Sequence, residues 1–122
     1  MLFWIAIGGG VGSVLRYVVG GAVQRAGGVA FPAGTLAVNV IGGFIIGVLF
    51  QHYMNMQTSP IVRAALITGF CGGFTTFSAF SIETVGLFEG GEYGKAAAYV
   101  VLSVIMSLGA TLAGMAAVKT IA

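Results

Sequence analysis

The chain has 122 residues, of which 58% are hydrophobic and 7% charged, with a formal net charge of +2. Soluble domains carry about 25% charged residues, so most of this surface must be solvated by lipid. The small, scattered positive charge excludes a nucleic-acid footprint. The single cysteine excludes an intrachain disulfide and a thiolate metal cluster.

Four long apolar runs follow one another, and each is long enough to cross a membrane, which takes about 20 residues. No basic residue precedes the first run, so we expect a retained span rather than a cleaved signal peptide. The short connections leave no room for a soluble domain, and residues 1–122 are expected to form a single transmembrane domain. The runs are Leu2–Val23, Ala33–Tyr53, Ile61–Phe88 and Lys95–Val118, with loops at Gln24–Pro32, Asn55–Pro60 and Glu89–Gly94.

The first run carries Arg16, a charged residue within an apolar stretch. Charge in lipid is costly, so Arg16 either snorkels to the nearer interface or attracts an anion at the mouth of a path. Pairs of glycines four residues apart let helix backbones approach closely in lipid, which predicts tight packing within the chain and between subunits. These pairs are Gly8 and Gly12, Gly43 and Gly47, and Gly69 and Gly73.

Polar groups also fall inside the second and fourth runs. Asn39 offers two hydrogen-bond donors and one acceptor, and Thr35 lies one turn earlier. In the fourth run hydroxyl groups recur every four residues, which places them along one helix stripe. A lone membrane serine usually bonds its own helix, but four hydroxyls in register favour a functional polar path. The stripe consists of Tyr99, Ser103, Ser107 and Thr111.

The third run contains Gly72-Gly73-Phe74-Thr75-Thr76 near its middle, where a helix is expected to break. Non-helical backbone at membrane depth requires protein or a wet cavity around it; the alternative is a kinked, tilted helix. Phe74, Phe77 and Phe80 then recur every three residues. Such a stripe usually serves packing, but aromatic ring edges are electropositive and can meet an anion. Together with the hydroxyls, Asn39 and Arg16, they favour an anion path over a cation path.

The distribution of basic residues bears on orientation. Four spans place both termini and the second loop on one side, with Arg63 and Lys119. Arg25 and Lys95 lie on the other side, and Arg16 is nearer to that side. Because an excess of basic residues normally marks the cytoplasmic side, this near-tie favours insertion in both orientations. Opposite copies would then pair about a two-fold axis in the membrane plane. The alternative is one fixed topology with a weak bias.

Catalytic chemistry has no support in the sequence. His52 is the only histidine and falls near a span end, there is no aspartate, and the three glutamates are far apart. A nucleophile, a base and an orienting group cannot be assembled from these residues. No Gly-Lys-Ser or Gly-Lys-Thr follows the glycine clusters, so no nucleotide is expected to bind.

Three segments form a recognisable pattern: Gly8–Ser13 with Arg16 and Tyr17, Pro32–Leu36 with Asn39, and Gly69–Phe80. This pattern resembles the CrcB/Fluc family of fluoride channels. The resemblance covers nearly the whole chain in the right order, and the motif in the third run is highly specific.

The resemblance implies an all-α membrane protein of four transmembrane helices with a broken third helix. It also implies a dual-topology antiparallel homodimer, passing several times through the plasma (inner) membrane of a bacterium or other microbe. Its function would be passive, fluoride-selective conduction that lowers cytoplasmic fluoride, without enzyme activity. Fluoride enters as the uncharged acid, ionises inside and is trapped unless a path leads out.

Residue roles carry over from the family by position. Phe77 and Phe80 match the two rings whose edges face fluoride, and Arg16 matches a vestibule arginine. Gly72 and Thr75 match positions whose backbone carbonyls hold a structural sodium ion at the dimer interface. The residues expected along the fluoride path are Asn39, Phe77, Phe80, Tyr99, Ser103, Ser107 and Arg16.

The sequence does not decide the roles of two positions. Glu83, late in the third run, matches a family carboxylate; from the sequence it either pairs with a basic group or reaches the interface. Ala79 stands where many members have threonine, which removes one hydroxyl from the region and leaves the contribution of that position open.

Two other functions fit four short spans. A small dual-topology cation or drug exporter has a similar size, but it relies on an embedded glutamate early in the chain. Here the first run carries Arg16 and no carboxylate, which counts against that function. A non-transporting membrane assembly protein would need neither the hydroxyl stripe nor the interrupted third run.

Overall fold

The computed structural model is all-helical and describes residues 1–55 and 58–121. Met56 and Gln57, in the predicted second loop, lie outside the described residues. The four predicted spans are confirmed as helices that are long and apolar enough to cross a membrane, with ends that differ by a few residues from the predicted runs. They are Leu2–Gly27, Ala33–Met54, Pro60–Glu89 and Tyr93–Ile121.

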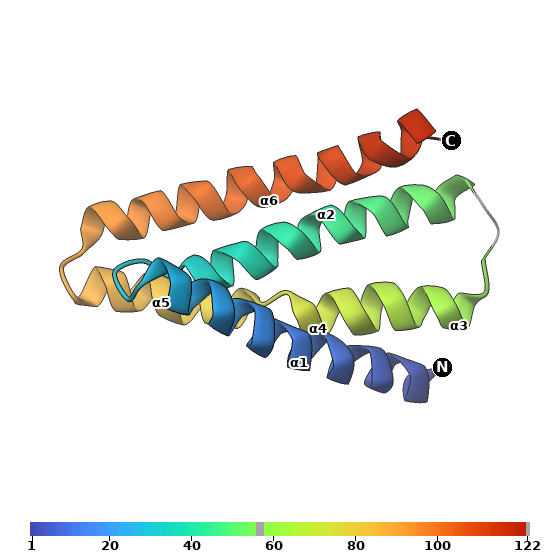
Figure 1. The fold of residues 1–122 in the computed structure, drawn as a ribbon, viewed down its shortest axis with the longest axis horizontal. Coiled ribbons are helices and arrows are strands. Elements are labelled where there is room, and N and C mark those ends of the chain that lie inside the picture. The colour runs from blue at the N-terminus through green and yellow to red at the C-terminus, as the bar shows by residue number, and fades with distance from the viewer. Residues whose placement is uncertain (56–57, 122) are drawn as a thin grey trace.

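The first, second and fourth spans are single helices, whereas the third is composite. Figure 1 shows both chain termini at one end of the bundle, and the connections that follow α1 and α5 at the other. The single helices are α1 (Leu2–Gly27), α2 (Ala33–Asn55) and α6 (Tyr93–Ile121). The third span consists of α3 (Pro60–Arg63), the π-helix η1 (Ala64–Cys71), α4 (Gly72–Phe74) and α5 (Phe77–Glu89).

Two residues with extended backbone angles separate α4 from α5. Thr75 has φ −92° and ψ 160°, and Thr76 has φ −150° and ψ 117°. The ribbon bends only slightly at this point (Figure 1), so α5 continues close to the direction of the preceding helices. Helical hydrogen bonding is therefore interrupted locally, and the span keeps its overall course.

The glycine pairs lie where helices touch, as their spacing predicts. α1 packs against η1 and α4, while α2 packs against α6. A Cβ atom added to Gly12 would collide with the carbonyl oxygen of Phe70, and one added to Gly47 would collide with that of Thr111. These pairs of helices are in contact through their backbones, which only glycine allows. The other members meet Ala65 (Gly8), Ser107 (Gly43), Ile5 (Gly69) and Gly9 (Gly73).

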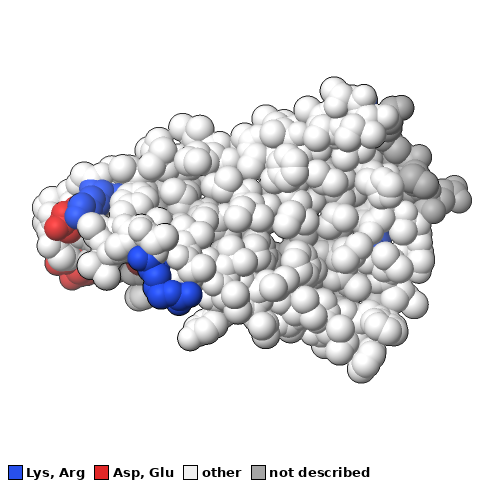
Figure 2. All heavy atoms as spheres, viewed as in Figure 1, with Lys and Arg blue, Asp and Glu red and all other residues white. Residues whose placement is uncertain are grey.

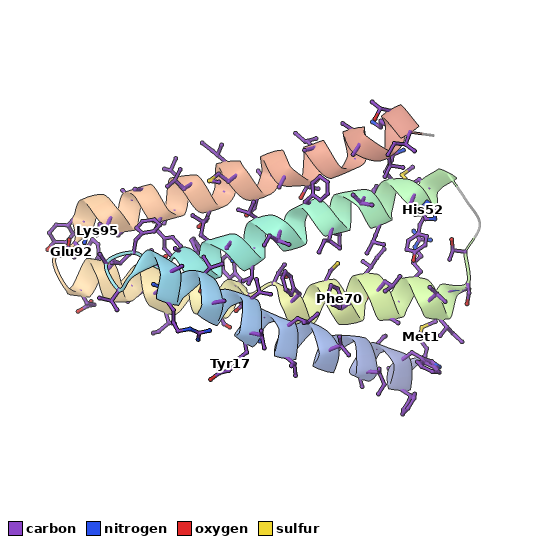
Figure 3. All side chains as sticks on the ribbon, in the orientation of Figure 1. Met1, Tyr17, His52, Phe70, Glu92 and Lys95 are labelled. Atoms are coloured by element: carbon purple, nitrogen blue, oxygen red, sulfur yellow. The ribbon has the colours of Figure 1, made fainter. Side chains whose placement is uncertain are left out.

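The buried core of the described chain is small. Cys71 is 3% exposed and packs as a small apolar residue. Many large apolar side chains are exposed instead; Tyr17, for example, projects away from the bundle (Figure 3). A surface of this kind is stable next to lipid or another apolar surface.

Charged residues gather at the end that carries the first and third loops, and most of the face drawn in Figure 2 is uncharged. Glu92 and Lys95 form an exposed ion pair there, with 3.7 Å between Oε2 and Nζ. This pair and His52 lie at opposite ends of the bundle (Figure 3), and His52 belongs to the last turn of α2, near a span end as predicted.

Candidate functional site

A cavity of about 390 Å³ lies beside the interruption of the third span, between α2, α5 and α6. Most of the residues predicted for the anion path meet here, although three different helices carry them. Those residues are Asn39, Phe77, Phe80, Ser103 and Ser107, and the remaining lining is formed by Thr75, Thr76, Val104 and Leu108.

The side chain of Asn39 bonds the backbone at the interruption. Its Nδ2 donates to the carbonyl oxygen of Thr76 at 3.0 Å, and its Oδ1 accepts from the Thr76 amide at 2.8 Å. Backbone polar groups inside a membrane must be satisfied by protein, and here one amide side chain satisfies both groups of one residue. The two bonds also fix which way the amide faces.

Thr76 also caps the next helix. Its Oγ1 accepts a hydrogen bond from the amide of Ala79 at 3.1 Å, and α5 begins at Phe77. Thr76 was not among the residues predicted for the site. The signal was present, because threonine directly before an apolar helical run is a typical N-cap. The cap places the positive end of the α5 dipole at the cavity.

Phe77 and Phe80 lie one turn apart at the start of α5. Their ring centroids are 5.4 Å apart with an interplanar angle of 47°. Phe77 is 78% exposed in the single chain, whereas Phe80 is half-buried and contacts the ring of Tyr99. The Phe80 ring is therefore supported from behind, on the side where Tyr99 lies.

The serines of the α6 stripe face the cavity. Ser103 is 8% exposed, and its Oγ has no hydrogen-bond partner among the described residues. A buried hydroxyl without a partner is unusual and is available to a ligand. The last hydroxyl of the stripe, that of Thr111, has a structural role. It donates to the carbonyl oxygen of Gly43, which joins α6 to α2, and to that of Ser107 within α6.

Tyr99 does not line this cavity. Its side chain is 0% exposed, and its hydroxyl donates to Oε1 of Glu83 at 3.3 Å. The hydroxyl of Thr35 donates to Oε2 of the same carboxylate at 3.0 Å. Glu83 thus accepts hydrogen bonds from two hydroxyls, a pairing that the sequence did not predict.

Arg16 lies apart from the serines and phenylalanines. Its Nε donates to the carbonyl oxygen of Gly73 at 2.9 Å, next to the interruption. It lines a second cavity of about 300 Å³, together with Arg25, Thr35 and Glu83. Thr76 lines both cavities, so both border the interrupted segment.

Gly72 and Thr75 line a further cavity of about 240 Å³, which Asn39 also borders. In a continuous helix the carbonyl oxygens of Gly72 and Thr75 would accept hydrogen bonds from the amides of Thr76 and Ala79, respectively. Here the Thr76 amide donates to Oδ1 of Asn39, and the Ala79 amide donates to Oγ1 of Thr76. The described residues hold no cluster of three or more His, Cys, Asp or Glu suited to a metal. Gly72 and Thr75 could offer their carbonyl oxygens to a hard cation.

Known proteins with similar sequences identify the family of this chain. A family model described as CrcB-like protein, Camphor Resistance (CrcB), matches residues 3–115. A Rhizobium etli protein named Fluoride-specific ion channel FluC is 49% identical over 121 residues, covering 98% of this chain and 97% of its own length. A Cereibacter sphaeroides protein of the same name is 49% identical over 121 residues, covering 97% and 94%. With four membrane-spanning helices and matches of this extent, the chain belongs to the CrcB-like family.

Proposed function

We propose that this protein is a passive, fluoride-selective channel of the plasma (inner) membrane, not an enzyme. The names of its relatives support this function, but the observation that carries it is the chemistry of the 390 Å³ cavity. Its described lining contains the unpartnered hydroxyl of Ser103, the hydroxyl of Ser107, the amide of Asn39 and two phenyl rings, and no carboxylate. Such a lining offers hydrogen-bond donors to an anion and lacks the carboxylate that would favour a cation.

Conduction follows from several weak sites in series. Fluoride loses water on entering a narrow pore, and donors along the wall must replace that water without holding the ion too long. Hydroxyl groups on α6 and ring edges on α5 would provide such donors, since both helices line the cavity. Arg16 would attract the anion into the second cavity, at the charged end of the bundle.

The working unit would be an antiparallel homodimer in which the two copies have opposite orientations. Two features support it: the near balance of basic residues between the two ends, and the extent of exposed apolar surface. Gly72, which is exposed with open space where a Cβ would lie, marks a place where a second backbone can approach closely.

A sodium ion would then serve as a structural cofactor at the interface. The Gly72 and Thr75 oxygens of each copy are free of the donors that a continuous helix would provide. A cation held by these oxygens would satisfy them in a dry interior without requiring a charged side chain. Its contribution would be to hold the two copies together at the interrupted spans.

An efflux assay tests the function. Purified protein in liposomes loaded with potassium fluoride should release fluoride when a potassium ionophore clamps the voltage. Liposomes loaded with potassium chloride should release their anion far more slowly. His52→Gln, at a span end and away from the cavities described above, serves as a control that keeps wild-type flux. Equal fluoride and chloride release by the wild type would refute the proposal.

A further inference from the structure

A continuous chain of four aromatic rings runs from the first loop to the cavity. Phe31 meets Tyr99 edge-on, with centroids 5.5 Å apart and an interplanar angle of 83°. Tyr99 contacts Phe80 at 5.2 Å, and Phe80 contacts Phe77 at 5.4 Å. The first ring lies outside the helices, and the last two line the cavity.

Phe31 is turned inward, whereas the three residues that precede it in the loop are exposed. Val29, two residues earlier, is fully exposed, whereas Phe31 is half-buried. A cavity of about 360 Å³ borders Phe31 on another side, so packing alone does not hold its ring in place. The ring needs a loop of fixed shape.

Hydrogen bonds made by Gln24 hold the loop in one shape. Its Nε2 donates to the carbonyl oxygens of Gly28 at 2.6 Å and Phe31 at 2.9 Å, and its Oε1 accepts from the amide of Gly34 at 3.0 Å. A single side chain thus joins the last turn of α1, the loop and the first turn of α2. These are side-chain to backbone bonds of the kind that fix loops.

Tyr99 is in contact with both Phe31 and Phe80. It is fully buried, its hydroxyl is held by Glu83, and its ring lies between those of Phe31 and Phe80. Without the outer ring, Tyr99 would gain space on the side away from the cavity. Phe80 would then lose the support that keeps its edge in one direction.

We infer that Gln24 and Phe31 are positioning residues for the Phe80 ring, and that they set anion selectivity from outside the cavity. The inference rests on the proposed channel function. Neither residue lines the 390 Å³ cavity, and each acts through backbone or ring contacts with another residue. This role could not be predicted from the sequence, because Phe31 lies in a loop far from Phe80 in the chain.

Phe31→Leu is the decisive variant. It should reduce fluoride release several-fold, up to about tenfold, as expected for loss of one aromatic pair, and it should lower the ratio of fluoride to chloride release. Phe31→Tyr keeps the ring and should restore both values. Phe88→Leu is the matched control, since Phe88 forms a ring pair with Tyr93 at 5.0 Å that is not part of the four-ring chain.

A second readout does not depend on transport. 4-Fluorophenylalanine placed at position 80 reports the surroundings of that ring through its ¹⁹F resonance. Phe31→Leu and Gln24→Ala should each shift or broaden this resonance, and Phe88→Leu should not. If Phe31→Leu does not assemble, the resonance in Gln24→Ala decides the matter.

Two results would overturn the inference: an unchanged resonance in Phe31→Leu or Gln24→Ala, or a loss of selectivity in Phe88→Leu equal to that in Phe31→Leu. Failure of the channel function itself looks different. In that case the wild type, with both positioning residues intact, would not discriminate fluoride from chloride.

Discussion

The amide side chain of Asn39 makes paired hydrogen bonds with the backbone of Thr76, one to its carbonyl oxygen and one from its amide. A residue on the second span thereby satisfies the backbone of the third span where helical bonding stops. Asn39 also lines the 390 Å³ cavity, so one side chain both shapes this site and faces it. A substitution there has two separable effects, on charge and on geometry.

Asn39→Asp should abolish fluoride release. The carboxylate can still accept from the Thr76 amide, but it places a negative charge beside the path of an anion. At about 4 Å and an effective dielectric constant of about 20, the repulsion is about 4 kcal/mol, which corresponds to about a thousandfold in rate. Asn39→Ala loses the hydrogen bonds without adding charge and should reduce release less. If the two variants release fluoride equally in liposomes, repulsion is not the cause.

Phe77→Ile and Phe80→Ile should each lower fluoride release by at least about tenfold. Isoleucine keeps an apolar side chain but has no electropositive ring edge to meet an anion. Size-exclusion chromatography should still show an assembled protein, because neither ring is part of the small buried core. Phe88→Ile, which removes a ring outside the cavity, is the control. Wild-type flux in both Phe77→Ile and Phe80→Ile would contradict the assignment of these rings.

Ser103→Ala should reduce fluoride transport without reducing the stability of the protein. The Ser103 hydroxyl is buried without a partner among the described residues, and such a group costs about 1–3 kcal/mol. Its removal should leave thermal stability unchanged or slightly raised, while fluoride release falls. Ser81→Ala removes a hydroxyl whose partner among the described residues is the Phe77 carbonyl, and it should change release little. A Ser103→Ala protein that is destabilised but conducts normally would mean that this hydroxyl serves structure alone.

Gly12→Ala should destabilise the fold. The added Cβ would meet the Phe70 carbonyl oxygen and would lie 2.8 Å from the Phe74 amide nitrogen, and backbone atoms cannot rotate away. Overpacking of this kind costs about 1–3 kcal/mol, which should appear as a lower midpoint when the detergent-solubilised protein is heated. Gly94→Ala, where nothing lies within 4 Å of the added atom, should keep the wild-type midpoint. Equal midpoints for both variants would contradict close packing of α1 on α4.

Membrane orientation should be mixed. A cysteine introduced at exposed Ser59, in a Cys71→Ala background, should be labelled by an impermeant reagent in about half of the molecules from each side. Two lysines added next to it should drive most molecules to one orientation and reduce fluoride release, if both orientations are needed. Labelling of every molecule from a single side would show that the chain has one fixed topology.

The sequence by itself determined the four spans, because length and hydropathy decide which segments partition into lipid. It also pointed to the region of Thr75 and Thr76, where the third span bends slightly, and to the serine stripe, whose four-residue spacing places Ser103 and Ser107 on one helix face. These properties depend on neighbours within a single helix, so periodicity and composition are sufficient to predict them.

Only the tertiary structure decided which polar groups face each other. Tyr99 belongs to the same stripe as Ser103, yet it is buried against Phe31, Phe80 and Glu83 and lies outside the cavity. Asn39 bonds a backbone 37 residues away, a pairing with no local signature. Helix periodicity fixes the face on which a side chain lies, whereas its partner depends on how far neighbouring helices slide and rotate, and that is set by packing across the whole bundle.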